Sequence, residues 1–480
     1  MSEQNLKYKT KKGIYFTFFN QFANNGLQFV VGVIMARLLS PSDYGVAALP
    51  AVFMAVAAIF MEGGFGRAIV RKENLKEEDL STAFIYSITV GVVCYLLIFI
   101  GAPCIADFYN EPVLEPLIRV TALSFLWSPL ATPQTILLQR KLDFKTPALF
   151  SVLTKTIGAA IGITMAYMGY GLWSLVIMGV VSSFVETVLL WSAVKWKPTT
   201  GWSNESFHYL WGYGNKMMLS SFLDTAYNNI APIIIGKYYS PADLGVYNRA
   251  QGYASLPSVQ GTRIVQVVTF PVLSKMQDND EQLASNYRRM LKTAAFVIFP
   301  VMTMLAALAK PFVVILVTEK WIDAVLLLQI LCFSMMWYPV HAINLNLLQV
   351  KGRSDWFLKL ELWKKCIGLI IMACTLPFGL VYFVSAGVAS SFIALFFNTY
   401  YTGKLINLGL LKQMKDLLPT YGLSILIFIV VLGVNQFIDN LWLQLILGTI
   451  VGSMLYLGLA VQFRFSELQD LKYMINSNRK

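Results

Sequence analysis

The sequence predicts an all-α polytopic membrane protein with about 14 transmembrane helices. Of its 480 residues, 56% are hydrophobic and only 13% are charged, and the mean hydropathy is +0.59. Apolar runs of about 20 residues, long enough to cross the hydrocarbon core of a bilayer, recur along the whole chain. These runs are continuous rather than alternating with a period of two, which excludes a transmembrane β-barrel.

Short connections separate the expected helices, so no sizeable domain outside the membrane is expected. The first helix lacks the small-residue cleavage site of a signal peptide and is expected to be retained. The helices are expected at roughly residues 13–39, 44–66, 81–105, 114–138, 144–168, 172–194, 206–236, 242–270, 288–317, 324–349, 355–378, 381–403, 416–437 and 441–463.

Basic residues mark one side of these helices. They are dense in the first residues of the chain, in RKENLKEED after the second helix and in QRKLDFK after the fourth. Connections on the other side, such as DFYNEPVLEP and MGYG, are acidic or uncharged. The positive-inside rule therefore predicts that both termini lie in the cytoplasm. The net charge of +12 reflects this topology, and no nucleic-acid partner is expected.

One phrase occurs twice: RLLSPSDYGV at residues 37–46 returns as KYYSPADLGV at residues 237–246. Further along, SFLWSPL at residues 124–130 matches SMMWYPV at residues 334–340. These matches predict a duplication, with an N-terminal six-helix lobe over 1–200 and a C-terminal six-helix lobe over 201–408. Two appended helices and a cytoplasmic tail follow over 409–480. Because six is even, the repeat is parallel, an arrangement that suits alternating access around a site between the lobes.

Both copies of the repeated phrase read as the start of a helix. Ser40 or Ser240 is expected to be the N-cap, with proline at the first helical position. Gly45 or Gly245 lets helices approach closely. We therefore interpret the motif as structural.

The residues that usually carry catalysis or metal binding are sparse. The chain has two histidines and five cysteines without CxxC spacing, so no metal site is expected. It contains no GxxxxGK[ST] loop for ATP. The sequence therefore predicts a protein that is not an enzyme and needs no cofactor.

Cations inside the membrane helices are the first candidate site residues, because an ionisable group there is costly. In the eighth helix, Arg249 is expected about 12 Å from the start and Arg263 about 33 Å from it. Lys155 and Lys365 lie at similar depths in the fifth and eleventh helices. Arginine and lysine suit an anionic group such as phosphate, so the cations favour an anionic cargo.

Polar residues on two repeat-related helices suggest a water-filled lumen. Asn24 and Gln28 are one turn apart in the first helix, and Asp224 and Asn228 occupy the equivalent positions in the seventh. We assign these four residues to substrate binding, together with the cations. Asp224 and Glu186 are the candidate residues for coupling to a proton or sodium gradient.

Two other ionisable groups are assigned to structure. Glu62 is expected to pair with Arg67, five residues further on. His341 is expected to be a core histidine with satisfied hydrogen bonds.

A collinear set of phrases resembles a known family. The set includes ARLLSPSDYG, GGFGRAIVRK, RKLDFK, IIGKYYSPADLGVYNRA and LNLLQVKGRSD, and it spans residues 36–354. It is similar to the polysaccharide transport family of flippases, in the colanic-acid and teichuronic-acid exporter branch of the multidrug/oligosaccharidyl-lipid/polysaccharide exporter superfamily. The resemblance implies a V-shaped pair of lobes and a cargo of undecaprenyl-diphosphate-linked oligosaccharide, moved from the cytoplasmic to the periplasmic leaflet. The expected partners are this lipid-linked cargo, membrane lipids, and the polysaccharide polymerase and assembly machinery.

Three alternatives stay open. A multidrug extruder and a lipid II flippase belong to the same superfamily. An integral-membrane glycosyltransferase, ligase or polymerase belongs to another class and would need an acid/base or metal constellation that the chain lacks.

Overall fold

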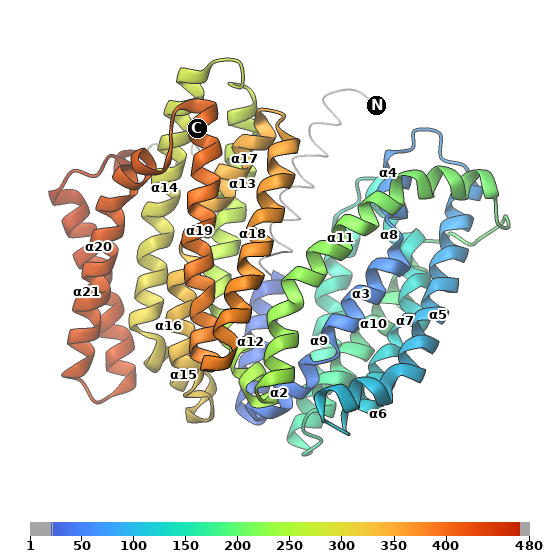
Figure 1. The fold of residues 1–480 in the computed structure, drawn as a ribbon. Helices are drawn as coiled ribbons and strands as arrows, with labels where there is room; N and C mark the ends of the chain where they lie inside the picture. Colours follow the sequence, from blue (N-terminus) through green and yellow to red (C-terminus); the bar gives the residue numbers. More distant parts are fainter. Residues whose placement is uncertain (1–20, 22, 471–480) are drawn as a thin grey trace. The chain divides into compact units, whose positions relative to one another are not determined.

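The computed structural model describes residues 21 and 23–470, and every regular element in this part of the chain is a helix (Figure 1). The predicted all-α class is thereby confirmed. The helices form two compact units, Met1–Gly245 and Val246–Lys480. The lobe boundaries expected at residues 200 and 408 concern the duplication, and they stay a prediction.

The first unit begins with a helix over residues 23–38. Its further helices are α2 (Pro41–Ala48), α3 (Ala51–Glu62), α4 (Phe65–Arg71), α5 (Glu77–Tyr109), α6 (Leu114–Ala122), α7 (Ser124–Trp127), the short η1 (Ser128–Ala131), α8 (Thr132–Arg140), α9 (Lys145–Tyr167), α10 (Trp173–Ala193) and α11 (Asn204–Tyr238).

The second unit begins within α12 (Pro241–Ser255), and a π-helical turn, η2 (Leu256–Gln260), joins α12 to the next helix. The remaining helices are α13 (Gly261–Ser274), α14 (Asp280–Ala307), α15 (Ala309–Val317), η3 (Glu319–Trp321), α16 (Ala324–Met335), α17 (Tyr338–Val350), α18 (Ser354–Thr375), η4 (Leu376–Phe378), α19 (Leu380–Ile406), α20 (Leu410–Gln436) and α21 (Leu441–Gln462).

Among the described residues, nine helical segments are long and apolar enough to cross a membrane. They confirm a multi-pass membrane protein, whereas the count of fourteen spans is not confirmed. Five expected spans are outside the nine. The first, 13–39, lies partly outside the described residues, of which the helix over 23–38 belongs to it. The other four correspond to the segment from α6 to α8, α11, the segment from α12 to α13, and α18, which are broken or more polar. Most of the predicted site residues lie on these five. Polar helices of this kind need neighbouring protein or water rather than lipid.

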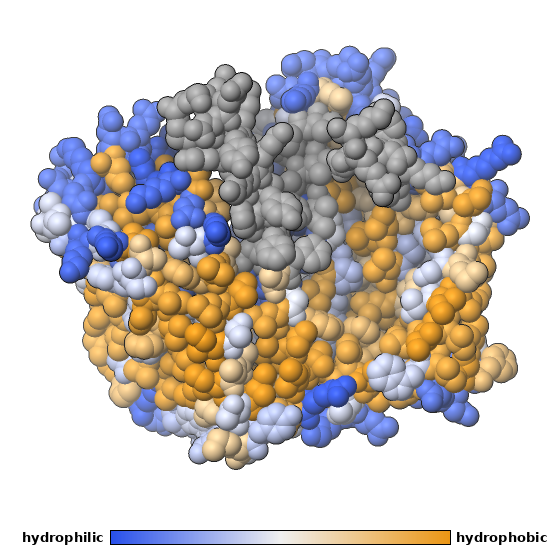
Figure 2. Space-filling view, turned by 180° about the vertical axis from the view of Figure 1, so that it is seen from behind, coloured by the Kyte–Doolittle hydropathy of each residue, from blue (hydrophilic) through white to orange (hydrophobic). Residues whose placement is uncertain are grey.

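The surface agrees with a membrane location. Figure 2 shows hydrophobic side chains gathered in a broad belt, with hydrophilic side chains above and below it. Many large apolar side chains are exposed, such as Ile100 at 74% and Met454 at 70%. An exposed apolar area this wide is unusual for a soluble protein and is the surface that lipid covers.

The repeated SPxDxG phrase forms helix caps, as predicted. At the start of α2, the Asp43 backbone N–H donates to Ser40 Oγ at 3.2 Å, and the Ser40 N–H donates to Asp43 Oδ2 at 2.9 Å. The same reciprocal pair joins Ser240 and Asp243 at 3.0 and 3.1 Å. Each motif thus satisfies the backbone donors at a helix start that no earlier turn can pair.

The two motifs also pack directly on each other within the first unit. A methyl group added at Gly45 would overlap the carbonyl oxygen of Pro241, and one added at Gly245 would overlap that of Pro41. Both glycines are buried. The glycines therefore allow a reciprocal backbone contact between the starts of α2 and α12, and the interpretation of close approach is confirmed.

A second pair of glycines turns the chain between α3 and α4. Gly63 and Gly64 have φ values of 56° and 70°, a left-handed conformation that glycine adopts without strain. Both lie against the backbone of α11, where a methyl group at Gly214 would press on the carbonyl oxygen of Gly63. The turn changes the direction of the chain between α3 and α4, so that Phe65, Ala68 and Ile69 of α4 are buried inside the unit.

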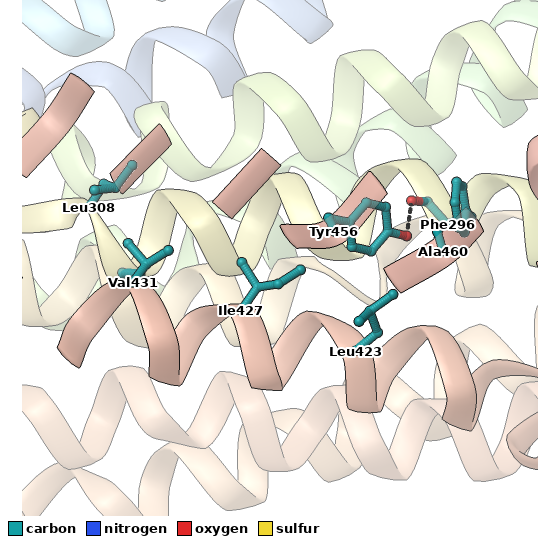
Figure 3. Close-up of a cluster of buried hydrophobic side chains, with 8 residues drawn as sticks. Phe296, Leu308, Leu423, Ile427, Val431, Tyr456 and Ala460 are labelled. Carbon is teal, nitrogen blue, oxygen red and sulfur yellow. Dashed lines mark hydrogen bonds between the residues drawn. The ribbon is translucent and has the colours of Figure 1, made fainter. Parts of the chain in front are cut away.

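The appended helices α20 and α21 are fixed to α14 by a buried apolar cluster (Figures 1 and 3). Figure 3 shows side chains from α14, α20 and α21 meeting in one row. Three ion pairs tie the same helices together near one end: Arg288–Asp416 at 2.5 Å, Arg289–Asp470 at 2.6 Å and Lys292–Glu467 at 2.9 Å. The two appended helices are therefore an integral part of the second unit.

One hydrogen bond in this cluster repairs a break in α14. Pro300 lies inside α14 and has no N–H, so the carbonyl of Phe296, four residues earlier, loses its helical donor. The Tyr456 hydroxyl donates to that carbonyl oxygen at 2.6 Å and is buried (Figure 3). A buried carbonyl at membrane depth needs such a partner, because no water is available there.

Replacing Tyr456 by phenylalanine should lower the free energy of unfolding by about 1–3 kcal/mol, the typical effect of leaving a buried acceptor without its donor. Thermal unfolding of the detergent-solubilised protein measures the change. Tyr382→Phe is the control, since that side chain is 62% exposed and should have no effect on stability. Equal melting temperatures for the two variants would show that the hydrogen bond from Tyr456 to the Phe296 carbonyl does not stabilise the protein.

Candidate functional site

The structure distributes the eight predicted binding residues over both units. The first unit contains Asn24, Gln28, Lys155, Asp224 and Asn228, and the second contains Arg249, Arg263 and Lys365. Each set is described within its own unit.

In the first unit, Asn24 and Lys155 lie close together. Asn24 is 7% exposed, and its Oδ1 accepts a hydrogen bond from Ser151 Oγ of α9 at 3.1 Å. Lys155 follows Ser151 by one turn on α9 and is half-buried. Its ammonium group attracts the carboxylate of Glu186 on the neighbouring helix α10. This attraction joins the predicted cation to one predicted coupling residue, although no ion pair forms between them among the described residues.

The other polar residues of this stripe are exposed. Gln28 lies on the helix over residues 23–38, and Asp224 and Asn228 lie one turn apart on α11. Exposed amide and carboxyl groups within a membrane helix favour contact with water or other polar groups over contact with lipid. Their exposure is compatible with the predicted lumen, and their role in binding stays a prediction.

In the second unit, Arg249 is held by aromatic rings. Its guanidinium carbon lies 5.3 Å from the ring centre of Trp321 and 5.8 Å from that of Tyr253. Trp321 is fully buried and Arg249 is half-buried. A guanidinium group stacked on aromatic faces keeps its plane fixed, which is the arrangement that presents its N–H groups to a phosphate with little loss of entropy.

The remaining two cations of the second unit differ in environment. Arg263 on α13 is exposed. Lys365 on α18 is half-buried and follows Lys364, whose ammonium group pairs with Glu361 at 2.5 Å. Both cations belong to helices that are too polar to count among the nine spans.

His341 has partners for both ring nitrogens, as predicted. The Asn398 amide nitrogen lies 3.1 Å from Nδ1, and Ser391 Oγ lies 2.9 Å from Nε2. Since an amide N–H can only donate, Nδ1 accepts and Nε2 carries the proton. A neutral histidine held in this way supports the structure of α17 and α19.

The first unit also contains a cavity that the sequence did not indicate. Its volume is about 630 Å³, and it lies between α4, the segment from η1 to α8, and α10. Its charged lining residues are Glu62, Arg67, Arg71 and Glu186, and hydroxyl groups and the amide of Gln139 complete the polar part of a mainly apolar lining. The predicted coupling residue Glu186 thus lines a defined cavity, and its role in coupling stays a prediction.

Arg140, at the end of α8, holds two helices of the cavity wall together, α8 and α4. Its Nη1 donates to the carbonyl oxygens of Ile69 at 2.6 Å and Lys72 at 2.5 Å.

In the connection between α8 and α9, burial disfavours the charged form of Asp143. Hydrogen bonds from the hydroxyl and N–H of Thr146 outweigh this effect and lower the pKa of Asp143. The charged Asp143 therefore anchors the start of α9, and Arg140 keeps α8 against α4.

The expected pair between Glu62 and Arg67 is wrong. No ion pair joins them in the described part of the chain, and Arg67 instead directs Nη1 to the sulfur of Met217 at 3.5 Å. The left-handed turn at Gly63 and Gly64 separates the two residues onto different helices. The double glycine between them was the signal against a pair on one continuous helix.

The comparisons with known proteins bear on these helices. A family model described as "Polysaccharide biosynthesis protein" matches residues 34–326, more than half of the chain. The chain belongs to this family. The matched region contains Lys155, Asp224, Arg249 and Arg263, and also Glu186.

Curated relatives of the family extend over most of the chain. The teichuronic acid biosynthesis protein TuaB of Bacillus subtilis is 24% identical over 446 residues, which are 91% of this chain and 92% of that protein. The lipopolysaccharide biosynthesis protein WzxC of Escherichia coli is 24% identical over 75% of this chain and 73% of its own. The succinoglycan biosynthesis transport protein ExoT of Rhizobium meliloti is 26% identical over 64% and 63%.

Solved structures show the fold. The lipid II flippase MurJ in an inward closed conformation aligns with a TM-score of 0.75 at 16% identity, over 94% of this chain and 99% of that chain. A multidrug resistance MATE family transporter in an inward-facing conformation aligns with a TM-score of 0.62 at 14% identity, over 80% and 96%. The family member described here thus has a MurJ- and MATE-like helical fold.

Proposed function

We propose that this protein is a flippase that moves a lipid-linked oligosaccharide, the repeat unit of a surface polysaccharide, across the bacterial inner membrane by alternating access. The carrier lipid is undecaprenyl diphosphate, and the direction is from the cytoplasmic to the periplasmic leaflet. Both termini are cytoplasmic in this proposal, and the protein transports its cargo without changing it chemically.

The family match over residues 34–326 is the observation that carries this proposal. Relatives named for the biosynthesis of teichuronic acid, lipopolysaccharide and succinoglycan share surface or secreted polysaccharides as the product, and one of them is named a transport protein. A polymer made of sugar units needs its hydrophilic units carried past the hydrocarbon core. Each unsatisfied polar group there costs several kcal/mol, so a protein path is required.

The cations within the membrane helices give the proposal a binding mechanism. Arg249, Arg263, Lys155 and Lys365 would neutralise the diphosphate, with arginine offering paired N–H groups and lysine a point charge. The exposed amide and carboxyl groups of Gln28, Asp224 and Asn228, together with the buried amide of Asn24, would meet the sugar hydroxyls. Asp224 and Glu186 remain the proposed residues for coupling to an ion gradient.

Reconstitution tests the function directly. Purified protein in liposomes should move a fluorescent undecaprenyl-diphosphate oligosaccharide between leaflets, measured by quenching with an impermeant reductant. Lipid II and a cationic dye are the competing cargoes in matched liposomes. Faster movement of the dye would support the multidrug alternative, and faster movement of lipid II would support a role in cell-wall synthesis. The polysaccharide polymerase is a proposed partner, which cross-linking in native membranes would test.

A further inference from the structure

Two adjoining cavities in the first unit differ in charge: both have largely apolar walls, but only one is also lined by charged side chains. The charged chamber of about 630 Å³ is lined by Glu62, Arg67, Arg71, Glu186 and a row of hydroxyl groups. A second chamber of about 390 Å³ has mainly apolar walls, which include Met54, Met61, Phe125 and Val176. Ser128 and Ser183 line both, so the two chambers meet at these serines. Their sizes fall in the range of small-molecule sites, about 300–1,000 Å³.

The arginines are placed for an anion. Arg67 and Arg71 are one turn apart on α4, and both line the charged chamber. Like charges at this spacing repel, and an anion between them removes the repulsion. Within the described residues, both arginines contact uncharged groups: Arg67 meets the Met217 sulfur, and Arg71 lies 5.3 Å from the centre of the Tyr213 ring. Neither arginine forms an ion pair in this part of the chain.

The rest of the charged chamber suits sugar hydroxyls. Thr132 and Thr135 of α8 face it from one side, and Ser183 and Thr187 of α10 line it from the other. Hydroxyl groups donate and accept, and the carboxylates of Glu62 and Glu186 accept. A purely anionic ligand would meet repulsion from two carboxylates, whereas a phosphate joined to a sugar matches both kinds of group.

From these observations, we infer that the first unit contains an entry site for a polyprenyl diphosphate sugar. The diphosphate binds Arg67 and Arg71, the first sugar lies among the hydroxyls, and the start of the polyprenyl chain occupies the apolar chamber. The inference rests on the proposed function and adds a site to it, because the residues assigned there to phosphate binding lie elsewhere. The chamber adjoins the basic connection that follows Arg71, on the predicted cytoplasmic side, where such a cargo is made.

Binding measurements on the full-length protein in lipid nanodiscs test the site with three probes: inorganic pyrophosphate, farnesyl diphosphate and farnesol. The double variant R67Q/R71Q should bind both diphosphates at least about 10-fold more weakly, because it loses the charge-assisted hydrogen bonds. Lys141→Gln is the matched control, since Lys141 is exposed at the end of α8 and outside the cavity. Its affinity for either diphosphate should stay within about twofold of the wild type.

A second variant tests the apolar chamber independently of the charged chamber. Gly179 of α10 lines the apolar chamber, and a side chain added there meets no atom within 4 Å at its Cβ. The Gly179→Leu variant should therefore fold normally, with its new side chain filling the apolar chamber. It should bind farnesyl diphosphate about 10-fold more weakly and pyrophosphate with unchanged affinity. Farnesol should bind weakly to every variant, because it lacks the diphosphate.

Cysteine protection provides a measurement that does not depend on the arginine variants. Thr135→Cys, in a background in which the five native cysteines are serine, should react with a thiol reagent, and farnesyl diphosphate should slow that reaction at least about threefold. The entry site is overturned if R67Q/R71Q binds both diphosphates as the wild type does, or if the probe leaves the labelling rate unchanged. It is also overturned if farnesol alone protects as well as farnesyl diphosphate.

The flipping assay distinguishes this inference from the proposed function. If the wild type moves the lipid-linked oligosaccharide while R67Q/R71Q keeps its affinity for both diphosphates, the entry site is wrong and the flippase stands. If the probes bind as expected but the wild type moves no oligosaccharide, the site stands and the flippase assignment fails.

Discussion

Replacing Gly45 by alanine should reduce flipping at least about 10-fold and lower the melting temperature of the protein, although alanine is the better helix former. The added methyl group overlaps the carbonyl oxygen of Pro241, which is backbone and cannot rotate away. The starts of α2 and α12 must then separate. Flipping in liposomes and thermal unfolding measure the two effects.

The reciprocal contact makes this prediction sharper. Gly245→Ala should have the same effect, because its methyl group meets Pro41. The decrease in stability of the double variant should be smaller than the sum of the decreases in the two single variants, because either substitution alone already opens the same contact. Gly101→Ala is the control, because a methyl group there has no neighbour within 4 Å. Wild-type stability and flipping in G45A would contradict the contact.

Replacing Arg249 by alanine should lower flipping about 100-fold without reducing the amount of protein in the membrane. A guanidinium group that gives a phosphate two charge-assisted hydrogen bonds contributes about 1.5–3 kcal/mol through each, and part of this is offset by hydration. Initial rates of oligosaccharide movement, compared at equal protein in the liposomes, measure the loss.

Two further variants separate charge from packing at this position. Arg249→Lys should recover only part of the rate, because lysine keeps the charge but not the planar stacked fork. Arg353→Ala is the matched control, since Arg353 also stacks on a tryptophan, 3.8 Å from the ring centre of Trp356, but is exposed and paired with Asp355. If R353A loses as much flipping as R249A, the effect is structural.

Periodicity and hydropathy were sufficient to predict the all-α class, the apolar helices and the capped starts of α2 and α12. These features depend on interactions between residues a few positions apart, and such interactions can be read from one sequence. The repair of α14 by Tyr456 could not be read in this way. Pro300 signals a missing donor, but the partner is 156 residues further along the chain and nothing local identifies it.

The sequence could nominate site residues but not their geometry, and their role in binding stays a prediction. Counting charges within the membrane helices identified Lys155 and Glu186, and in the structure the Lys155 ammonium group attracts the Glu186 carboxylate from the adjacent helix. Neither Arg67, which was assigned to a pair with Glu62, nor Arg71 could be assigned to a cavity from the sequence, because both lie near a helix end. Only the turn at Gly63 and Gly64, which redirects α4, places them on a cavity.

The mutual fit of the two SPxDxG motifs gives a physical reason why the same phrase stands at both places in the chain. Each motif packs against the backbone of the other, so a residue larger than glycine at position 45 or 245 is tolerated only if the other motif changes as well. Natural variants of this family should therefore show paired substitutions at positions 45 and 245, or none at all. Engineers who exchange one half between relatives would need to transfer both motifs together.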